Sequence, residues 1–139
     1  MQRDVRASAT RDAAAGEWVA IIDDHDSLRT SIARALRLEG IRVQSFASAE
    51  AFLDRETESS PVCLVLDMQL PAMNGHELMH FLQSERPPLP PTILISGHED
   101  MLKTVGECCT PHGRLRKPFE VEALLSLLLP LLTINPAPD

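Results

Sequence analysis

The chain has 139 residues, which is enough for one domain with a single hydrophobic core. Its net charge of −7 at pH 7 argues against a nucleic-acid-binding protein, because such proteins carry a clustered basic face. Three cysteines, two of them adjacent, do not make a disulfide framework, and no apolar run suits a signal peptide or a membrane span. We therefore expect a cytoplasmic protein without nucleic-acid or membrane partners.

Short apolar runs alternate along the chain with helical patterns. Residues 1–16 predict a disordered lead, residues 17–132 a folded domain, and residues 133–139 a flexible tail. The apolar runs predict strands at residues 18–22, 41–46, 62–66, 92–95 and 115–116. The first predicted helix is capped by Asp26 or Ser27 and ends at Gly40, and the second is capped by Ser48. A third helix begins near Gly75, and a final helix begins at Glu120 and is interrupted or ended by Pro130. A poor helix is expected within residues 101–110.

Five alternations of strand and helix predict an α/β fold, a doubly wound five-stranded parallel sheet with helices on both faces. In such a sheet, ligands bind beyond the carboxyl ends of the strands. Polar residues follow four predicted strands: Asp23 and Asp24 the first, Asp67 the third, Ser96 the fourth and Lys117 the fifth. We expect these side chains to form one site.

The residue types at this edge indicate phosphoryl transfer to a carboxylate. Three converging carboxylates repel one another and need a cation, and oxygen ligands with open positions favour Mg2+. Asp67 is the natural nucleophile, because a carboxylate can form an acyl phosphate while the cation offsets the charge. Lys117 and the Ser96 hydroxyl can each contact a phosphoryl oxygen. Any one of these residues alone is more often a turn residue or a helix cap, so the interpretation depends on the joint pattern.

Four segments resemble the signatures of receiver domains from two-component response regulators: residues 21–24 (IIDD), 66–75 (LDMQLPAMNG), 95–98 (ISGH) and 117–119 (KPF). The likeness covers about residues 17–132 and is closest to the nitrogen-fixation regulator branch. It implies the flavodoxin-like receiver fold and a phosphorelay role, in which a histidine kinase or histidine phosphotransfer protein supplies the phosphoryl group. A receiver of this kind is not an enzyme and catalyses only its own phosphorylation and dephosphorylation.

The resemblance also implies a set of ligands for Mg2+. Asp67 is the phosphoacceptor and a metal ligand, and Asp24 binds the metal directly. Asp23 acts largely through water. The backbone carbonyl of Gln69 completes the protein ligands.

Further roles are implied for the residues around the phosphoryl group. Ser96 is the switch hydroxyl, and Lys117 is the phosphoryl contact, aimed by a cis Lys117–Pro118 bond. Gln69 and His98 are expected to flank the path of an attacking water and so to set the rate of dephosphorylation.

The chain departs from the family pattern at the switch. The third position before the conserved lysine usually holds Tyr or Phe, and here it is Arg114.

Nothing after residue 132 reads as an output domain, which indicates a stand-alone receiver. Arg114 and the poor helix expected within residues 101–110 leave open an alternative function, a receiver-fold scaffold that binds a partner regardless of phosphorylation. The many leucines of residues 124–132 exceed one buried stripe and predict a homodimer or a bound partner at the C-terminal helix.

Two other clusters could bind metal. Residues 76–80 (HELMH) match the H-E-x-x-H pattern of zinc proteases, but no third ligand follows at a persuasive distance. Cys108, Cys109 and His112 form one cluster without a paired C-x-x-C. Metal binding by the His76 and His80 pair or by the cysteine pair stays open.

A phosphatase of the haloacid-dehalogenase type is a second enzyme class to weigh. Such enzymes use an Asp nucleophile after a strand together with Mg2+, and they need a second Asp two residues later. That position is Gln69, so the general acid is missing and turnover is expected to be poor.

Overall fold

The computed structural model of the chain describes residues 17–55, 59–97 and 110–132. The predicted lead, the predicted tail, residues 98–109 and with them His98, Cys108 and Cys109 lie outside these residues. The elements of the described residues are, in chain order, β1 (Val19–Ile22), α2 (Asp26–Leu38), β2 (Val43–Phe46), α3 (Ala49–Leu53), β3 (Cys63–Asp67), α4 (Gly75–Glu85), β4 (Thr92–Ser96), β5 (Gly113–Arg116), α6 (Val121–Leu128) and the 3-10 turn η2 (Leu129–Leu131).

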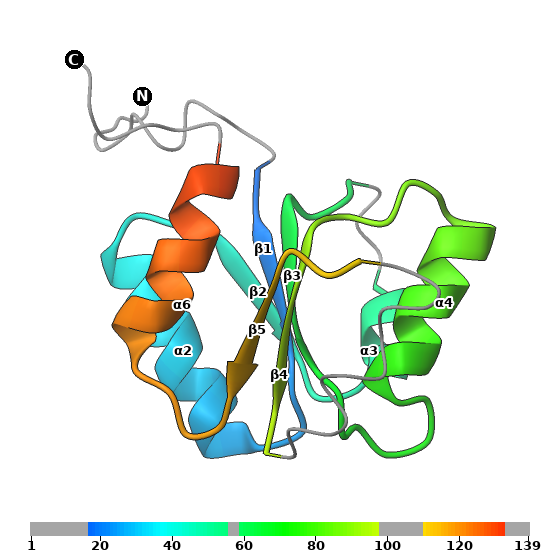
Figure 1. Cartoon of the computed structure of the whole chain (residues 1–139), viewed down its shortest axis with the longest axis horizontal. Coiled ribbons are helices and arrows are strands. Elements are labelled where there is room, and N and C mark those ends of the chain that lie inside the picture. Colours follow the sequence, from blue (N-terminus) through cyan, green and yellow to red (C-terminus); the bar gives the residue numbers. More distant parts are fainter. Residues whose placement is uncertain (1–16, 56–58, 98–109, 133–139) are drawn as a thin grey trace.

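The strands form one parallel sheet in the order β2-β1-β3-β4-β5. Helices α2 and α6 cover one face, and α3 and α4 cover the other (Figure 1). This arrangement confirms the predicted doubly wound α/β fold. The chain leaves β1 toward β2 and leaves β3 toward β4, so the carboxyl ends of β1 and β3 border the crevice where ligands bind in such sheets.

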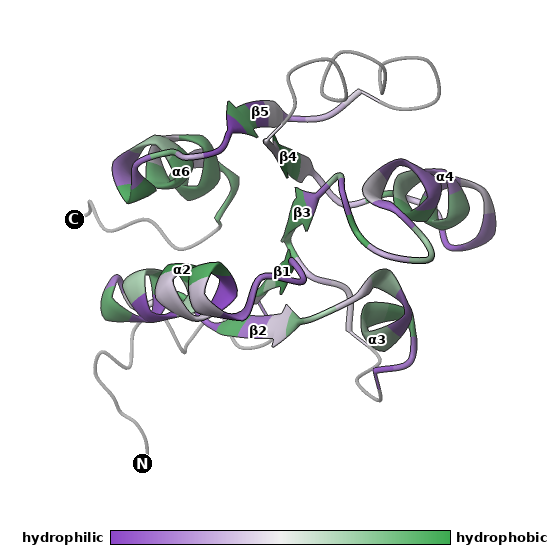
Figure 2. Cartoon of the chain, turned by 90° about the horizontal axis from the view of Figure 1, so that it is seen from below, coloured by the Kyte–Doolittle hydropathy of each residue, from purple (hydrophilic) through white to green (hydrophobic). Residues whose placement is uncertain are grey.

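The core consists of two apolar layers, one on each face of the sheet. Strand β3 is fully buried, as its unbroken apolar run predicts for a strand covered on both sides. Leu64 and Leu66 pack with Phe52 in one layer, whereas Val65 packs with Ile32 in the other. The apolar stripes of the helices face the sheet on both sides (Figure 2). These layers hold the ends of the strands in place, and they thereby position the polar residues that follow the strands.

The predicted cap of α3 and the predicted end of α2 are confirmed, whereas the predicted cap of α2 is wrong. Ser48 caps α3 by accepting a 3.0 Å hydrogen bond from the Ala51 N–H, and Gly40 follows α2 with a φ of 84°, which favours glycine. The N-cap of α2, however, is His25 and not Asp26 or Ser27, and its side chain makes no capping hydrogen bond. The Asp26 carboxylate lies inside the first turn instead, where it pairs with Arg29 at 2.7 Å.

The leucines of the C-terminal helix pack within the chain. Leu124 and Leu128 are fully buried, and Leu127 lies against Gly113 of β5, where an added methyl group would meet it at 2.8 Å. The other leucines are partly buried against the α2 side of the core: Leu125, Leu129, Leu131 and Leu132. Pro130 ends the regular helix, as predicted. Intramolecular packing therefore explains the leucines, and the homodimer stays a prediction.

No helix within the described residues is long and apolar enough to cross a membrane. Burial raises the pKa of the Cys63 thiol to about 12, so this cysteine is a core residue with little thiolate at neutral pH.

Candidate functional site

The carboxyl edge of the sheet brings together the polar residues that the sequence predicts there. Asp23 follows β1, and Asp67 is the last residue of β3, the neighbouring strand. Ser96 ends β4, and its carbonyl accepts a 2.8 Å hydrogen bond from the N–H of Lys117, which follows β5. Because parallel strands end at the same edge, residues from four separate segments meet here.

Lys117 lies between two fully buried carboxylates. Its Nζ donates a 3.1 Å hydrogen bond to Asp67 Oδ2 and lies 3.1 Å from Asp23 Oδ2. The second contact is an ion pair without hydrogen-bond alignment, and Asp23 Oδ2 accepts no hydrogen bond within the described residues. The peptide bond between Lys117 and Pro118 is cis, as predicted. One ammonium group therefore neutralises part of the charge of two carboxylates.

The surroundings of the Asp67 carboxyl shift its pKa in both directions. Burial holds the pKa of its carboxyl above the ordinary value, and the neighbouring Asp23 charge acts in the same direction. Hydrogen bonds from the Gln69 N–H, at 2.9 Å to Asp67 Oδ1, and from Lys117 oppose this effect. A bound cation would favour the ionised, nucleophilic form in the same way as Lys117 does.

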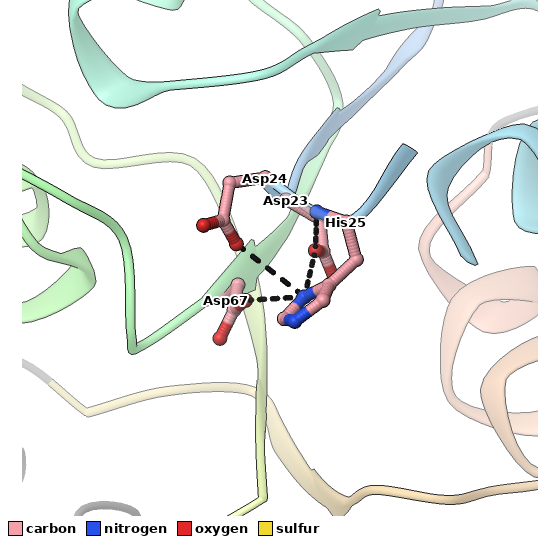
Figure 3. A group of neighbouring side chains, drawn as sticks. All are labelled: Asp23, Asp24, His25 and Asp67. Carbon is pink, nitrogen blue, oxygen red and sulfur yellow. Dashed lines mark hydrogen bonds and ion pairs between the residues drawn. The ribbon is translucent and has the colours of Figure 1, made fainter. Parts of the chain in front are cut away.

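His25 belongs to this cluster, although no sequence pattern assigned it a role. Its imidazole Nδ1 lies 3.0 Å from Asp23 Oδ1, 3.4 Å from Asp24 Oδ1 and 3.9 Å from Asp67 Oδ2 (Figure 3). Nζ of Lys117 is 3.3 Å from the same nitrogen. Only its position in the sequence could have predicted this placement. A histidine directly after Asp23 and Asp24 lies at the same strand end as they do.

The backbone around the site is held from two sides. Arg29 Nη1 donates a 2.8 Å hydrogen bond to the Asp23 carbonyl from the first turns of α2. On the other side, α4 starts so close to β3 that a Cβ on Gly75 would lie 2.7 Å from the Asp67 carbonyl oxygen and 2.9 Å from Met68 Cα. Only glycine fits this approach, so the loop after Asp67 is closely constrained.

The side chains present fit a metal ion. Asp23, Asp24, His25 and Asp67 each offer one ligand atom, and these atoms all lie within 4.8 Å of one another. Within the described residues, no other group of three or more such side chains comes together. The fully buried carboxylates of Asp23 and Asp67 share the single ammonium group of Lys117, so the site keeps a negative charge that an added cation would offset.

The remaining predicted site residues lie around this centre. Ser96 is fully buried, whereas Arg114 is exposed on β5, in register with Leu94 of β4. Gln69 is exposed, and its side-chain oxygen lies near Gly97, the residue after Ser96. His98, the second predicted rate-setting residue, is outside the described residues.

The zinc-protease alternative does not fit the structure. Glu77, its required general base, accepts a 2.9 Å hydrogen bond from the Asn74 N–H, and the Asn74 side chain accepts one from the Glu77 N–H at 2.8 Å. This capping box begins α4 and occupies the carboxylate. His76 is partly buried and His80 exposed on the same helix, and neither belongs to a ligand cluster among the described residues.

Comparison with known proteins identifies the family. The sequence profile described as "Response regulator receiver domain" matches residues 19–129. Response regulator protein TmoT of Ectopseudomonas mendocina is 33% identical over 84% of this chain and 53% of its own length. Transcriptional regulatory protein FixJ of Bradyrhizobium diazoefficiens is 31% identical over 78% of this chain and 53% of its own length.

The solved structures agree with the sequence comparison. A response regulator receiver protein from Burkholderia phymatum is 30% identical and has a TM-score of 0.72, covering 86% of this chain and 97% of that one. The present chain spans about half the length of TmoT and of FixJ. From its sequence signatures, its sheet topology and these matches, the chain belongs to the receiver-domain family of two-component response regulators.

Proposed function

We propose that this receiver takes a phosphoryl group onto Asp67 from a histidine kinase or histidine phosphotransfer protein, with Mg2+ bound beside it. The observation that carries the proposal is the setting of Asp67: a fully buried carboxylate at the carboxyl end of β3, hydrogen-bonded to Lys117 and next to Asp23 and Asp24. Charge pairs of this kind at a crevice are typical of functional sites.

In the proposed transfer, a carboxylate oxygen of Asp67 forms a bond to phosphorus. The bond from phosphorus to the donor's imidazole nitrogen breaks, and its electron pair returns to that nitrogen. Lys117 is placed to contact a phosphoryl oxygen, because its Nζ already lies at Asp67 Oδ2. The Ser96 hydroxyl would donate a hydrogen bond to another such oxygen. Bound Mg2+, held by Asp24, Asp67 and the Gln69 carbonyl, would offset the negative charge of the transferred group.

The direct test uses the protein with acetyl phosphate as a small phosphodonor. We expect a mass gain of one phosphoryl group by intact-mass spectrometry when Mg2+ is present and none when the metal is chelated. Uptake that is equal with and without Mg2+ would count against the proposed role of the metal.

Asp24 and Asp23 should contribute unequally to Mg2+ affinity. Asp23 Oδ1 already accepts a 2.8 Å hydrogen bond from the His25 N–H, whereas the Asp24 side chain is 36% exposed and available. We therefore expect Asp24→Ala to abolish binding in a calorimetric titration, and Asp23→Ala to weaken it less, by about 10–100-fold, the usual effect of removing an outer-sphere partner. Equal losses in the two variants would argue against this division of roles.

Arg114 should remain outward or pair with an acidic group when the receiver is activated. Burying a guanidinium without a partner would cost several kcal/mol, so this residue is a poor substitute for an aromatic switch. We expect a crystal structure of the beryllofluoride-bound protein to keep Arg114 exposed, as it is here, and the same complex of Arg114→Tyr to turn the ring inward. An Arg114 that turns inward with its strand would restore the usual switch and refute this account.

The exposed Arg114 also favours a second candidate, a receiver-fold scaffold whose partner binds regardless of phosphorylation. The two functions differ in one measurable property. A phosphorelay receiver changes its affinity for a kinase or an output partner when beryllofluoride is added, and a scaffold does not.

A further inference from the structure

A histidine lies inside the acidic cluster, in a place where the proposed transfer gives it no task. His25 enters the cluster from the start of α2, with Nδ1 directed at the carboxylates of Asp23, Asp24 and Asp67 (Figure 3). We propose that His25 is a nitrogen ligand of the bound cation, and that the site therefore accepts transition dications of the Co2+ and Zn2+ class besides Mg2+. This inference deepens the proposed function, on which it rests for the identity of the site.

The spacing of the ligand atoms fits one ion. Protein ligands about 2.1 Å from a cation lie about 3–4 Å from one another at tetrahedral or octahedral angles. Nδ1 of His25 is 3.4 Å from Asp24 Oδ1 and 3.9 Å from Asp67 Oδ2. The imidazole is thus at ligand distance from the two carboxylates proposed to bind the metal directly.

A second observation points to a cation independently of the number of acidic residues. Asp23 is fully buried, and its Oδ2 accepts no hydrogen bond within the described residues. Its charge is met only in part by Lys117, whose Nζ is shared with Asp67. A buried carboxylate oxygen in this state favours an added positive group close by.

The backbone explains why the ring faces the cluster. His25 occupies the N-cap of α2, where a side chain usually accepts a hydrogen bond from the helix, but this ring makes none. Its N–H donates to Asp23 Oδ1 instead, at 2.8 Å, and Nδ1 lies 3.0 Å from the same oxygen. The backbone contact therefore places the ring beside the cluster. When a cation binds between Nδ1 and the carboxylate oxygens, Nδ1 offers it a lone pair in the tautomer that carries the proton on Nε2.

A nitrogen ligand changes which metals the site prefers. Carboxylate, carbonyl and water oxygens suit Mg2+ and Mn2+, whereas imidazole suits Zn2+ and its first-row neighbours. Loss of the His25 nitrogen should therefore affect Co2+ or Zn2+ binding far more than Mg2+ binding. A solvated histidine that merely balances the charge of the carboxylates would not discriminate between metals in this way.

The first measurement is pulsed electron paramagnetic resonance of Mn2+ added to the full chain. Mn2+ replaces Mg2+ at oxygen-rich sites, and a coordinated imidazole adds a nitrogen modulation to its echo signal. We expect this modulation in the parent and in His80→Ala, the matched control for an exposed histidine outside the cluster, and its loss in His25→Ala.

The second measurement compares affinities for Co2+ and Mg2+ by calorimetry in the same three proteins and in Asp24→Ala. Loss of an outer-sphere partner already costs roughly 10–100-fold in affinity, so loss of a direct ligand should reduce Co2+ affinity by at least that range. The reduction for Mg2+ in His25→Ala should be much smaller. Asp24→Ala should abolish the binding of both metals. That loss would show that the measured binding takes place at this site.

Bound Mn2+ without nitrogen modulation in the parent would overturn the inference, and so would equal losses of Co2+ and Mg2+ affinity in His25→Ala. Phosphoryl uptake by the parent from acetyl phosphate separates this failure from that of the proposed function. Uptake without nitrogen modulation refutes the role of His25 alone, whereas nitrogen modulation without uptake refutes the phosphoacceptor role and leaves a mixed-ligand metal site.

Discussion

Replacing Asp67 with asparagine is expected to abolish phosphoryl uptake from acetyl phosphate. The amide keeps the shape of the carboxylate but carries no negative charge and no nucleophilic oxygen, so no acyl phosphate can form. Intact-mass spectrometry after incubation with Mg2+ and acetyl phosphate should show the unmodified mass only. The effect should be complete, because the proposed transfer forms its new bond on this side chain alone.

Asp54→Asn is a matched control for this experiment. Asp54 is an exposed residue at the end of α3, away from the carboxyl edge at which Asp67 lies, and its replacement removes the same charge. That variant should gain one phosphoryl group like the parent. An Asp67→Asn protein that still gains the phosphoryl mass would show that another residue accepts the group and would remove the basis of the proposed function.

Much of this fold could be predicted from the sequence because burial leaves a direct pattern. The apolar run of residues 62–66 predicted the fully buried β3, and the alternating run of residues 41–46 predicted β2 at the edge of the sheet. Parallel strands then imply that Asp23, Asp67 and Lys117 share one edge. The site followed from the fold, because side chains that follow parallel strands meet without any information about their rotamers.

The features that the sequence did not predict depend on the direction of single side chains. His25 follows the acidic pair like an ordinary loop residue, and only the start of α2 turns its ring toward the carboxylates. The start of α4 was predicted near Gly75, but the capping box that Asn74 forms with Glu77 was not. The leucines of α6 were too numerous for one helical stripe, yet the η2 turn lets the last of them reach the same core.

Replacing Lys117 with methionine should destabilise the receiver when no divalent cation is present. The ammonium group lies 3.1 Å from both Asp67 Oδ2 and Asp23 Oδ2, and neither carboxylate has any solvent exposure. Removing one partner of a buried ion pair typically costs about 3–5 kcal/mol, because the remaining charge stays buried. We expect the lower end of this range, since 17% of the Lys117 side chain meets solvent and Asp67 can take up a proton. Urea denaturation with a chelator measures the change.

The cause of that loss can be tested with a second charge removal and with the metal. Arg116→Met removes the same charge from an exposed side chain one residue earlier and should cost no more than about 1 kcal/mol. In the Lys117→Met protein, adding Asp67→Asn should recover part of the lost stability, because one buried charge disappears. Saturating Mg2+ should stabilise Lys117→Met more than the parent, since the cation then faces carboxylates that have lost their other counter-charge. Equal destabilisation by Lys117→Met and Arg116→Met, or equal stabilisation of parent and Lys117→Met by Mg2+, would show that Lys117 does not compensate the buried acidic pair.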